Sequence, residues 1–284
     1  MTTKVIAIAG ATGFLGGRVT TALLDAQVFD IRILARSSSA NSKKLQNFKA
    51  RGATLHSVSY DDETSLVGAL KGVDVLLSTV GGNALLSAQI PLIRAAKAAG
   101  VATFFPSEFG GRFENFESSS PLIQAKQQVV QAAKDAGLPF TVLATGPFPE
   151  ACLIPLFGYD FTNKKITIWG NPEVKITFTT TGSIADWLAH VLKHVPISQL
   201  QNRYLNIQGD FASANDVIKH WERKHQAKLD VEHRSLEEVE QRMKNPNDVI
   251  ALFLTAWYSG QVQLKPLDND LYPDWKPASV ESVL

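Results

Sequence analysis

Near its start the chain reads Val5-Ile6-Ala7-Ile8-Ala9-Gly10-Ala11-Thr12-Gly13-Phe14-Leu15-Gly16. The first five residues form a continuous apolar run, which is typical of a strand buried on both faces of a parallel sheet. Glycines follow at every third position, and apolar residues take up helical spacing from Phe14 onward. The stretch therefore predicts a strand, a tight turn and a helix in succession.

The same order of elements repeats along the first half of the chain. Repeated alternation of buried strands with amphipathic helices is typical of an α/β fold with a parallel sheet. We therefore predict a Rossmann-type, doubly wound parallel sheet over residues 1–150. The expected strands lie at 31–35, 53–58, 73–78, 102–105 and 139–144, and the expected helices at 14–24, 43–50, 63–70, 87–100 and 121–136.

The pattern becomes irregular after about residue 148, where prolines and aromatic residues are frequent. We predict a smaller α+β substrate-binding region over residues 151–284, part of which returns to the Rossmann sheet. Its expected strands are 165–169 and 204–207, and its expected helices are 214–225 and 235–243.

Length and composition limit the class of protein. A chain of 284 residues with 45% hydrophobic and 19% charged residues is ordinary for one large globular domain with a smaller appendage. The net charge of +1 gives no broad basic field for nucleic acid or an anionic membrane, so we expect a small-molecule partner. The single cysteine, Cys152, fits a reducing compartment, and we expect a cytoplasmic monomer or homodimer without a membrane span.

The glycine-rich turn predicts a dinucleotide site. At a strand-turn-helix junction, small residues allow a sharp turn, and the helix N-terminus offers unpaired N–H groups to a diphosphate. The spacing here is G-x-x-G-x-x-G, and the alternative is a purely structural glycine turn. The predicted diphosphate-binding residues are Gly10, Ala11, Thr12, Gly13, Phe14, Leu15 and Gly16.

The residue after the second predicted strand selects the cofactor. A carboxylate there would accept a hydrogen bond from the ribose 2′-hydroxyl but would repel a 2′-phosphate. That residue is Arg36, and Lys43 or Lys44 could add positive charge. The sequence thus predicts NADPH/NADP+ as the cofactor, and the alternative is a solvated basic loop.

Lys126 lies on the apolar side of its predicted helix. An apolar setting disfavours an ammonium group and lowers the pKa of a lysine, which suits it to proton transfer. The alternative is a side chain that reaches solvent past the sheet edge. The pair Tyr-x-x-x-Lys is absent, because Leu122 stands four residues earlier. The apolar arc around Lys126 consists of Leu122, Ile123, Val129, Val130 and Ala133.

Three segments together resemble the isoflavone reductase-like, NmrA-like group of atypical short-chain dehydrogenases. They are the glycine-rich turn, the run Phe104-Phe105-Pro106-Ser107-Glu108-Phe109-Gly110, and Lys126 with the following Gly137-Leu138-Pro139-Phe140-Thr141-Val142. The similarity extends to the closing Leu271-Tyr272-Pro273-Asp274-Trp275-Lys276.

This resemblance implies an NADPH-dependent oxidoreductase that reduces a small aromatic, phenylpropanoid- or isoflavone-like substrate. It implies that Lys126 is the catalytic lysine at the cofactor and that Arg36 binds the 2′-phosphate. The nicotinamide side would be lined by Thr79, Val80, Gly81, Ser107, Glu108, Phe109, Gly146, Pro147 and Phe148. Gly146-Pro147 and Gly111-Arg112 depart from the usual family residues, so the plant substrates do not transfer directly.

Two other functions fit parts of the sequence. A non-catalytic NADP(H) redox sensor that acts as a transcriptional co-regulator is the main alternative, since NmrA-like relatives include such proteins. An epimerase or lyase would usually keep the absent Tyr-x-x-x-Lys pair.

His190 and His194 stand four residues apart without an evident third ligand, so we expect no metal. Cys152 is expected to be a buried apolar residue.

Overall fold

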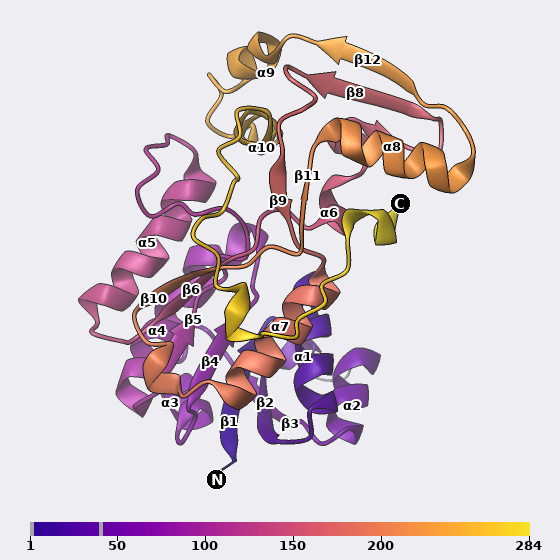
Figure 1. Cartoon of the computed structure of the whole chain (residues 1–284). Helices are drawn as coiled ribbons and strands as arrows, with labels where there is room; N and C mark the ends of the chain where they lie inside the picture. The colour runs from indigo at the N-terminus through magenta and orange to yellow at the C-terminus, as the bar shows by residue number, and fades with distance from the viewer. Residues whose placement is uncertain (1–2, 40–41) are drawn as a thin grey trace. The chain divides into compact units, whose positions relative to one another are not determined.

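The computed structural model describes residues 3–39 and 42–284. The chain divides into two compact units, whose helices and strands are labelled in Figure 1. The first unit comprises Met1–Glu108, Ala125–Leu143 and Ile184–Leu205. The second unit comprises Phe109–Gln124, Ala144–Ser183 and Asn206–Leu284.

The first unit is built on a five-stranded parallel sheet with the strand order β3-β2-β1-β4-β5. The chain order reverses between β1 and β4, which is where doubly wound sheets bind ligands. A parallel bridge from Phe104 to Phe140 continues the sheet toward β6, which pairs with β10. The strands are β1 (Lys4–Ala9), β2 (Phe29–Arg36), β3 (Thr54–Val58), β4 (Val75–Ser78), β5 (Thr103–Phe105), β6 (Thr141–Ala144) and β10 (Arg203–Asn206).

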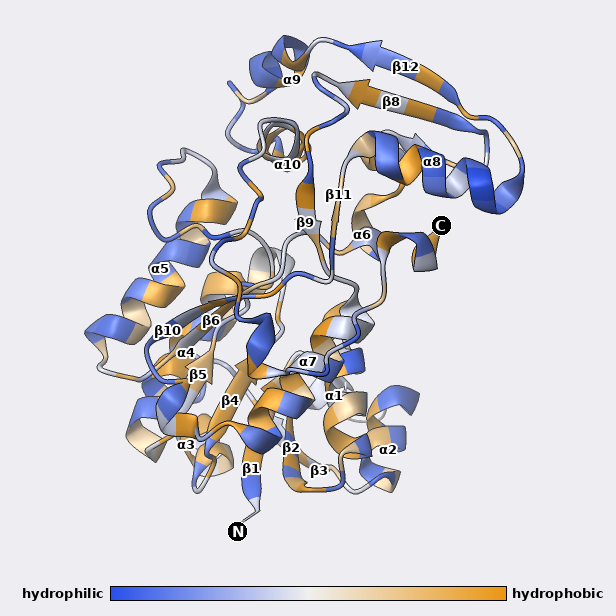
Figure 2. Ribbon diagram, viewed as in Figure 1, coloured by the Kyte–Doolittle hydropathy of each residue, from blue (hydrophilic) through white to orange (hydrophobic). Residues whose placement is uncertain are grey.

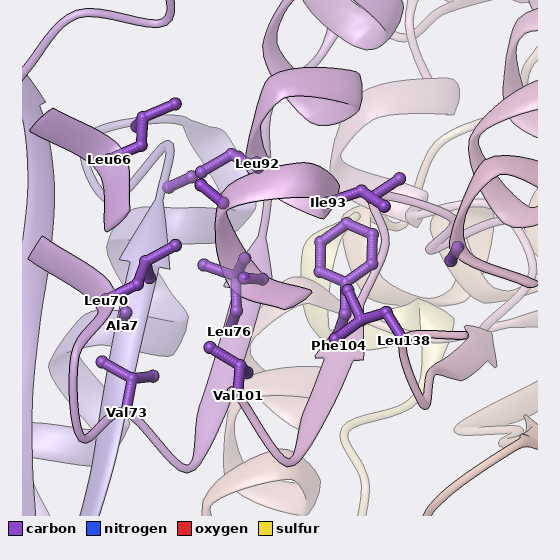
Figure 3. Packing of buried hydrophobic residues seen from close by; sticks show 14 of the residues in the cluster. Ala7, Leu66, Leu70, Val73, Leu76, Leu92, Ile93, Val101, Phe104 and Leu138 are labelled. Carbon is purple, nitrogen blue, oxygen red and sulfur yellow. The ribbon is translucent and has the colours of Figure 1, made fainter. Parts of the chain in front are cut away.

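Six α-helices accompany these strands in the described part of the chain, α5 and α7 running on from the second unit. Apolar side chains of α3, α4 and α5 pack with those of the sheet into one buried cluster, part of which is drawn in Figure 3. Figure 2 shows hydrophobic residues concentrated along β4 and β5. The helices are α1 (Phe14–Asp25), α2 (Lys43–Ala50), α3 (Glu63–Leu70), α4 (Leu85–Ala99), α5 (Pro121–Asp135) and α7 (Thr181–His194), with short turns η1 (Ser37–Ser39), η2 (Gly82–Ala84) and η4 (Ile197–Gln199).

The second unit has its own hydrophobic core around two small sheets. One sheet has the order β12-β8-β7, and in the other β9 pairs antiparallel with β11. Its elements are α6 (Pro149–Cys152), η3 (Pro155–Phe157), β7 (Tyr159–Asp160), β8 (Lys165–Trp169), β9 (Ile176–Phe178), β11 (Asp210–Ala212), α8 (Ala214–His225), β12 (Asp230–Arg234), α9 (Leu236–Arg242), α10 (Val249–Tyr258), η5 (Asn269–Leu271) and η6 (Val280–Val283).

The expected α/β class and parallel sheet are confirmed. The two units interleave in sequence. The predicted boundary at residue 150 and the predicted return of part of residues 151–284 to the Rossmann sheet stay predictions. Residues 184–205 belong to the first unit, where β10 finds its pairing partner β6. Residues 109–124 belong to the second unit, where the Gly110 carbonyl accepts hydrogen bonds from the amides of Thr145 and Gly146, each at 3.0 Å.

Among residues 3–39 and 42–284, no helix combines the length and the apolar character that crossing a bilayer requires.

Candidate functional site

A groove of about 460 Å³ lies in the first unit, at the carboxyl ends of the parallel strands. The end of β2 and the segments that follow β1, β3 and β4 all contribute to it. This is the position at which open α/β sheets bind dinucleotides. The lining residues are Gly10, Ala11, Thr12, Gly13, Ile33, Leu34, Ala35, Arg36, Ser39, Leu45, Tyr60, Asp61, Thr79, Val80, Gly81, Ala84, Ser87 and Ala88.

The glycines of the turn are required by close packing. Gly10 has φ +86°, and a β-carbon there would lie 2.8 Å from the Thr79 carbonyl carbon. The Gly13 amide donates to the Gly10 carbonyl at 2.9 Å, which closes the turn. A β-carbon on Gly16 would overlap both the Gly10 carbonyl oxygen and Thr79 Oγ1. Only glycine therefore allows β1, α1 and the end of β4 to approach this closely.

The N-terminus of α1 is available to an anion. In the described ranges, 3–39 and 42–284, no side chain caps the helix at its N-cap residue, Gly13. The first N–H groups of a helix have no intrahelical partner, and the helix dipole adds partial positive charge there. Ala11, Thr12 and Gly13 line the groove directly before these amides. The turn thus has the geometry and the charge that a diphosphate needs.

Arg36 brings a positive charge to the groove at the end of β2. It is the last residue of β2, it is exposed, and it lines the groove together with Tyr60. Burial raises the pKa of Tyr60, and the nearby Arg36 charge partly offsets this rise. Ser39 donates from Oγ to the Arg36 carbonyl at 2.9 Å, which fixes the backbone after the strand. Asp61 also lines the groove, so the charge there is mixed.

The two lysines at the start of α2 differ in position. Lys44 Nζ donates to the Thr12 carbonyl at 2.9 Å and to the Gly13 carbonyl at 3.4 Å. A β-carbon on Gly17 would overlap Lys44 Nζ. The lysine side chain therefore packs against α1 at Gly17, where the missing side chain leaves room for it. Lys43 is exposed at the first position of α2. Of the two lysines, Lys44 is therefore the one held against the glycine-rich turn.

Lys126 lies in a second cluster within the first unit. Its Nζ donates to the Glu108 carbonyl at 2.7 Å and to the Ser107 carbonyl at 3.2 Å. It also lies 3.5 Å from Glu108 Oε2, and the Lys126 and Glu108 side chains are 14% and 5% exposed. Of the predicted apolar arc, Ile123, Val129, Val130 and Ala133 are buried and Leu122 is half-buried. The setting of the ammonium itself differs from the apolar one we expected, because a carboxylate and two carbonyls surround it.

Four predicted cofactor residues, Phe109, Gly146, Pro147 and Phe148, belong to the second unit. Gly146 has a structural reason to be glycine: its φ is +66°, and a β-carbon would overlap the Thr177 carbonyl oxygen. The Pro147 carbonyl accepts from the Thr179 amide at 3.3 Å. The close contact with Thr177 explains Gly146 by packing within the second unit, whereas any residue at position 147 could accept through its carbonyl. The cofactor role of the four residues stays a prediction.

Comparison with known proteins identifies the family. The chain matches the model of the NmrA-like family over residues 2–270. This chain belongs to the NmrA-like family. It is 30% identical over 302 residues to phenylcoumaran benzylic ether reductase PT1 of Pinus taeda, covering 98% of this chain and 97% of the relative. It is also 37% identical over 225 residues to oxidoreductase aprR of Aspergillus flavus, covering 77% of this chain and 72% of that protein.

Among solved structures, this NmrA-like chain is similar to AtPrR2 with NADP+ and (+)pinoresinol. The TM-score is 0.84 at 25% identity, and the match covers 99% of this chain and 97% of the other. The expected resemblance to isoflavone reductase-like proteins and the expected fold are both confirmed.

Sequence reasoning missed two residues near the groove of this NmrA-like protein. Tyr60 follows β3 and lines the groove beside Arg36, but nothing in the local pattern marks it. Gln89 is a polar residue on the apolar face of α4, 1% exposed between the buried Ala88 and Leu92. The helical pattern test that singles out Lys126 would also have found Gln89.

The two features discounted from sequence have plain structural settings. Cys152 is buried in the core of the second unit, and burial raises the pKa of its thiol, so it is an apolar core residue as expected. The rings of His190 and His194 lie 4.4 Å apart. Within the described part of the chain, there is no group of three or more His, Cys, Asp or Glu side chains that could hold a metal.

Proposed function

We propose that this protein reduces a small aromatic substrate with hydride from NADPH, and that Lys126 holds or donates the proton at the reacting centre. The coarser part follows from the family: the chain is an oxidoreductase, NADP(H) is its cofactor, and its relatives are reductases of aromatic compounds. What remains to be tested is the substrate of this chain and the role of each residue.

One observation carries the proposal: the groove joins an uncapped helix N-terminus to an exposed guanidinium. The glycine-rich turn offers backbone amides to a diphosphate, and a side chain at Gly10 or Gly16 would fill the cradle. Arg36 stands where a carboxylate would select NADH instead. These residues fit NADPH better than NADH.

When bound, NADPH supplies a hydride from nicotinamide C4, and the chain must supply orientation and a proton. Thr79, Val80 and Gly81 form the wall of the groove after β4 and are proposed to hold the nicotinamide side. Lys126 is a proton donor in hydrogen-bond contact with fixed acceptors, so its Nζ is held in one place. Glu108 offsets the lysine charge in this buried setting.

An aromatic substrate is supported by the named relatives. The Pinus taeda relative is named as a benzylic ether reductase, and AtPrR2 was solved with pinoresinol. For this chain we propose the same broad class, with the carbon of a benzylic ether, or a double bond conjugated to an aromatic ring, as the hydride acceptor. The substrate-binding role of residues 151–284, the cytoplasmic location and the monomeric or homodimeric state stay predictions.

The test is NADPH oxidation over a panel of benzylic ethers, aromatic enones, propenyl phenols and quinones. We expect turnover with at least one class, and a loss of at least about 100-fold in kcat for Lys126→Ala, the usual range for removing a general acid or base. Lys134→Ala, on the same helix, is the matched control and should keep kcat.

Two outcomes would contradict the proposal. If Lys126→Ala turned over at the wild-type rate, the proton would have to come from elsewhere. If no substrate of the panel were reduced while the protein bound NADP+ and NADPH with clearly different affinities, the redox-sensor function would replace the reductase.

A further inference from the structure

The segment that holds Lys126 is itself a tight turn. The Glu108 amide donates to the Pro106 carbonyl at 2.8 Å, which closes a three-residue γ-turn around Ser107. The carbonyls of Ser107 and Glu108 both accept from Lys126 Nζ. The position of the ammonium therefore depends on the conformation of this turn.

Gln89 fixes the turn from α4. Its Oε1 accepts from the Ser107 amide at 2.8 Å, and its Nε2 donates to the Leu85 carbonyl at 3.2 Å. The side chain is 1% exposed, so both ends of the amide are bonded in a dry setting. A buried amide with both ends bonded has one defined orientation, because rotation would leave a polar group unpaired.

Gln89 also lies next to the groove along the chain. Ser87 and Ala88, the two residues before it on α4, line the groove. The helix that forms one wall of the groove thus fixes, through Gln89, the peptide that holds Lys126. All of these residues belong to the first unit.

We propose that Gln89 is a positioning residue, which sets the Pro106-Ser107-Glu108 turn and thereby the location of Lys126 Nζ relative to the groove. This inference rests on the proposed function, since it assumes that Lys126 takes part in the reaction. Gln89 acts through the Ser107 peptide and makes no chemical step of its own.

The decisive variant is Gln89→Met, which keeps an unbranched side chain of similar length and removes both hydrogen bonds. We expect kcat to fall at least about 10-fold, because displacements near 1 Å of a catalytic group can cost up to about 100-fold. The KM for NADPH should stay within about twofold, since the glycine-rich turn and Arg36 are untouched. Gln128→Met, an exposed glutamine on α5, is the matched control and should change neither value.

A structural role alone would lower the melting temperature and the active fraction but not the rate of each folded molecule. The kcat values are therefore normalised to the NADPH-binding sites measured by titration. Gln89→Glu keeps an acceptor for the Ser107 amide and, in the neutral form that burial favours, a donor for the Leu85 carbonyl, so it should recover kcat to within about threefold of wild type. Gln89→Asn is one methylene shorter and should not recover it, because it cannot span both partners.

The outcomes separate this inference from the proposed function. If Lys126→Ala keeps wild-type kcat, the role of Lys126 fails, and the inference fails with it. If Lys126→Ala loses activity while folded Gln89→Met keeps it, the inference alone is overturned. Should Gln89→Met not fold, equal kcat in Gln89→Glu and Gln89→Asn overturns the inference, and recovery in the Glu variant only supports it.

Discussion

Gly16 on α1 packs so closely against Gly10 at the end of β1 that a β-carbon on Gly16 would overlap the Gly10 carbonyl oxygen. The same β-carbon would overlap Thr79 Oγ1 after β4. Two strand ends and the start of a helix therefore meet where no side chain fits. This contact sets the direction of the first α1 amides, and the proposed diphosphate site depends on that direction.

Gly16→Ala should therefore damage both stability and cofactor binding. Overpacking a tight contact costs roughly 1–3 kcal/mol, and the shift of α1 would move the amides away from the diphosphate. Gly68→Ala is the control: Gly68 lies in α3, and an added β-carbon meets nothing within 4 Å. That variant should gain about 0.5–1 kcal/mol, because glycine is unfavourable inside a helix. Urea unfolding and NADPH titration measure both effects, and a Gly16→Ala protein that binds and unfolds like wild type would refute the packing argument.

Lys44 should matter more to NADPH binding than Lys43. Both lysines are exposed, but Lys44 Nζ donates to the carbonyls of Thr12 and Gly13 and so brings its positive charge to the turn, whereas Lys43 stands at the first position of α2. Because Lys44 is exposed to solvent, we expect Lys44→Met to cost about 1 kcal/mol, or about fivefold in Kd. Lys43→Met should cost less than twofold. An equal or larger loss for Lys43→Met in parallel titrations would rule out this assignment.

Asp216 should give α8 a pH-dependent stability. Ser213 and Asp216 form a capping box: the Asp216 amide donates to Ser213 Oγ at 3.1 Å, and the Ser213 amide donates to Asp216 Oδ2 at 3.0 Å. The hydrogen bond from the Ser213 amide is the main cause that lowers the pKa of Asp216, with a smaller contribution from Lys175. A lowered folded-state pKa means that this stability is fully present above the unfolded pKa of about 3.9 and is lost as the pH falls through the folded value.

Asp216→Asn should accordingly lower the free energy of unfolding by about 1 kcal/mol at neutral pH. The difference from wild type should shrink as the pH is lowered below about 4. Asp230→Asn, at an exposed position on β12, serves as the control. Denaturant unfolding across this pH range is the measurement, and a difference that grows toward acid would have the wrong sign.

The first unit was largely predictable because its elements carry local signals. The helices α2 and α3 begin and end at the predicted residues, and side chains of Ser42 and Asp62 cap their N-termini. Gly100, at φ +76°, ends α4 as expected. Where the hydrophobic periodicity and the capping residues agree, local sequence alone predicts the bounds of a helix.

The second unit was less predictable because several of its elements lack such local signals. The helix α10 (Val249–Tyr258) is apolar on nearly all sides, so it lacks the polar face that marks an amphipathic helix. Strands β9 and β11 have three residues each, too few for an alternating pattern. Such elements form because the surrounding core accepts them, which local sequence does not reveal.

The candidate site likewise has a part that local sequence predicts and a part that only the fold brings together. The glycine-rich turn and Arg36 are local features, and their places in the groove follow from the strand-turn-helix pattern. The partners of Lys126 lie 18 and 19 residues away in sequence, so only the folded chain brings the Glu108 carboxylate to the ammonium. The sequence therefore indicated that Lys126 is unusual, but it did not indicate that Glu108 and the two carbonyls surround it.

Calorimetric titration with NADPH and NADH, for wild type and Arg36→Ala, is the most direct test of the proposed dinucleotide site in the groove. We predict that wild type binds NADPH at least about 10-fold more tightly than NADH. Arg36→Ala should weaken NADPH binding by roughly 10- to 100-fold, the loss expected for one charged hydrogen-bonding group, and leave NADH within about threefold. Arg51→Ala, whose guanidinium pairs with Asp25, is the control and should change neither affinity. Equal wild-type affinities for the two cofactors, or an unchanged preference in Arg36→Ala, would contradict the account.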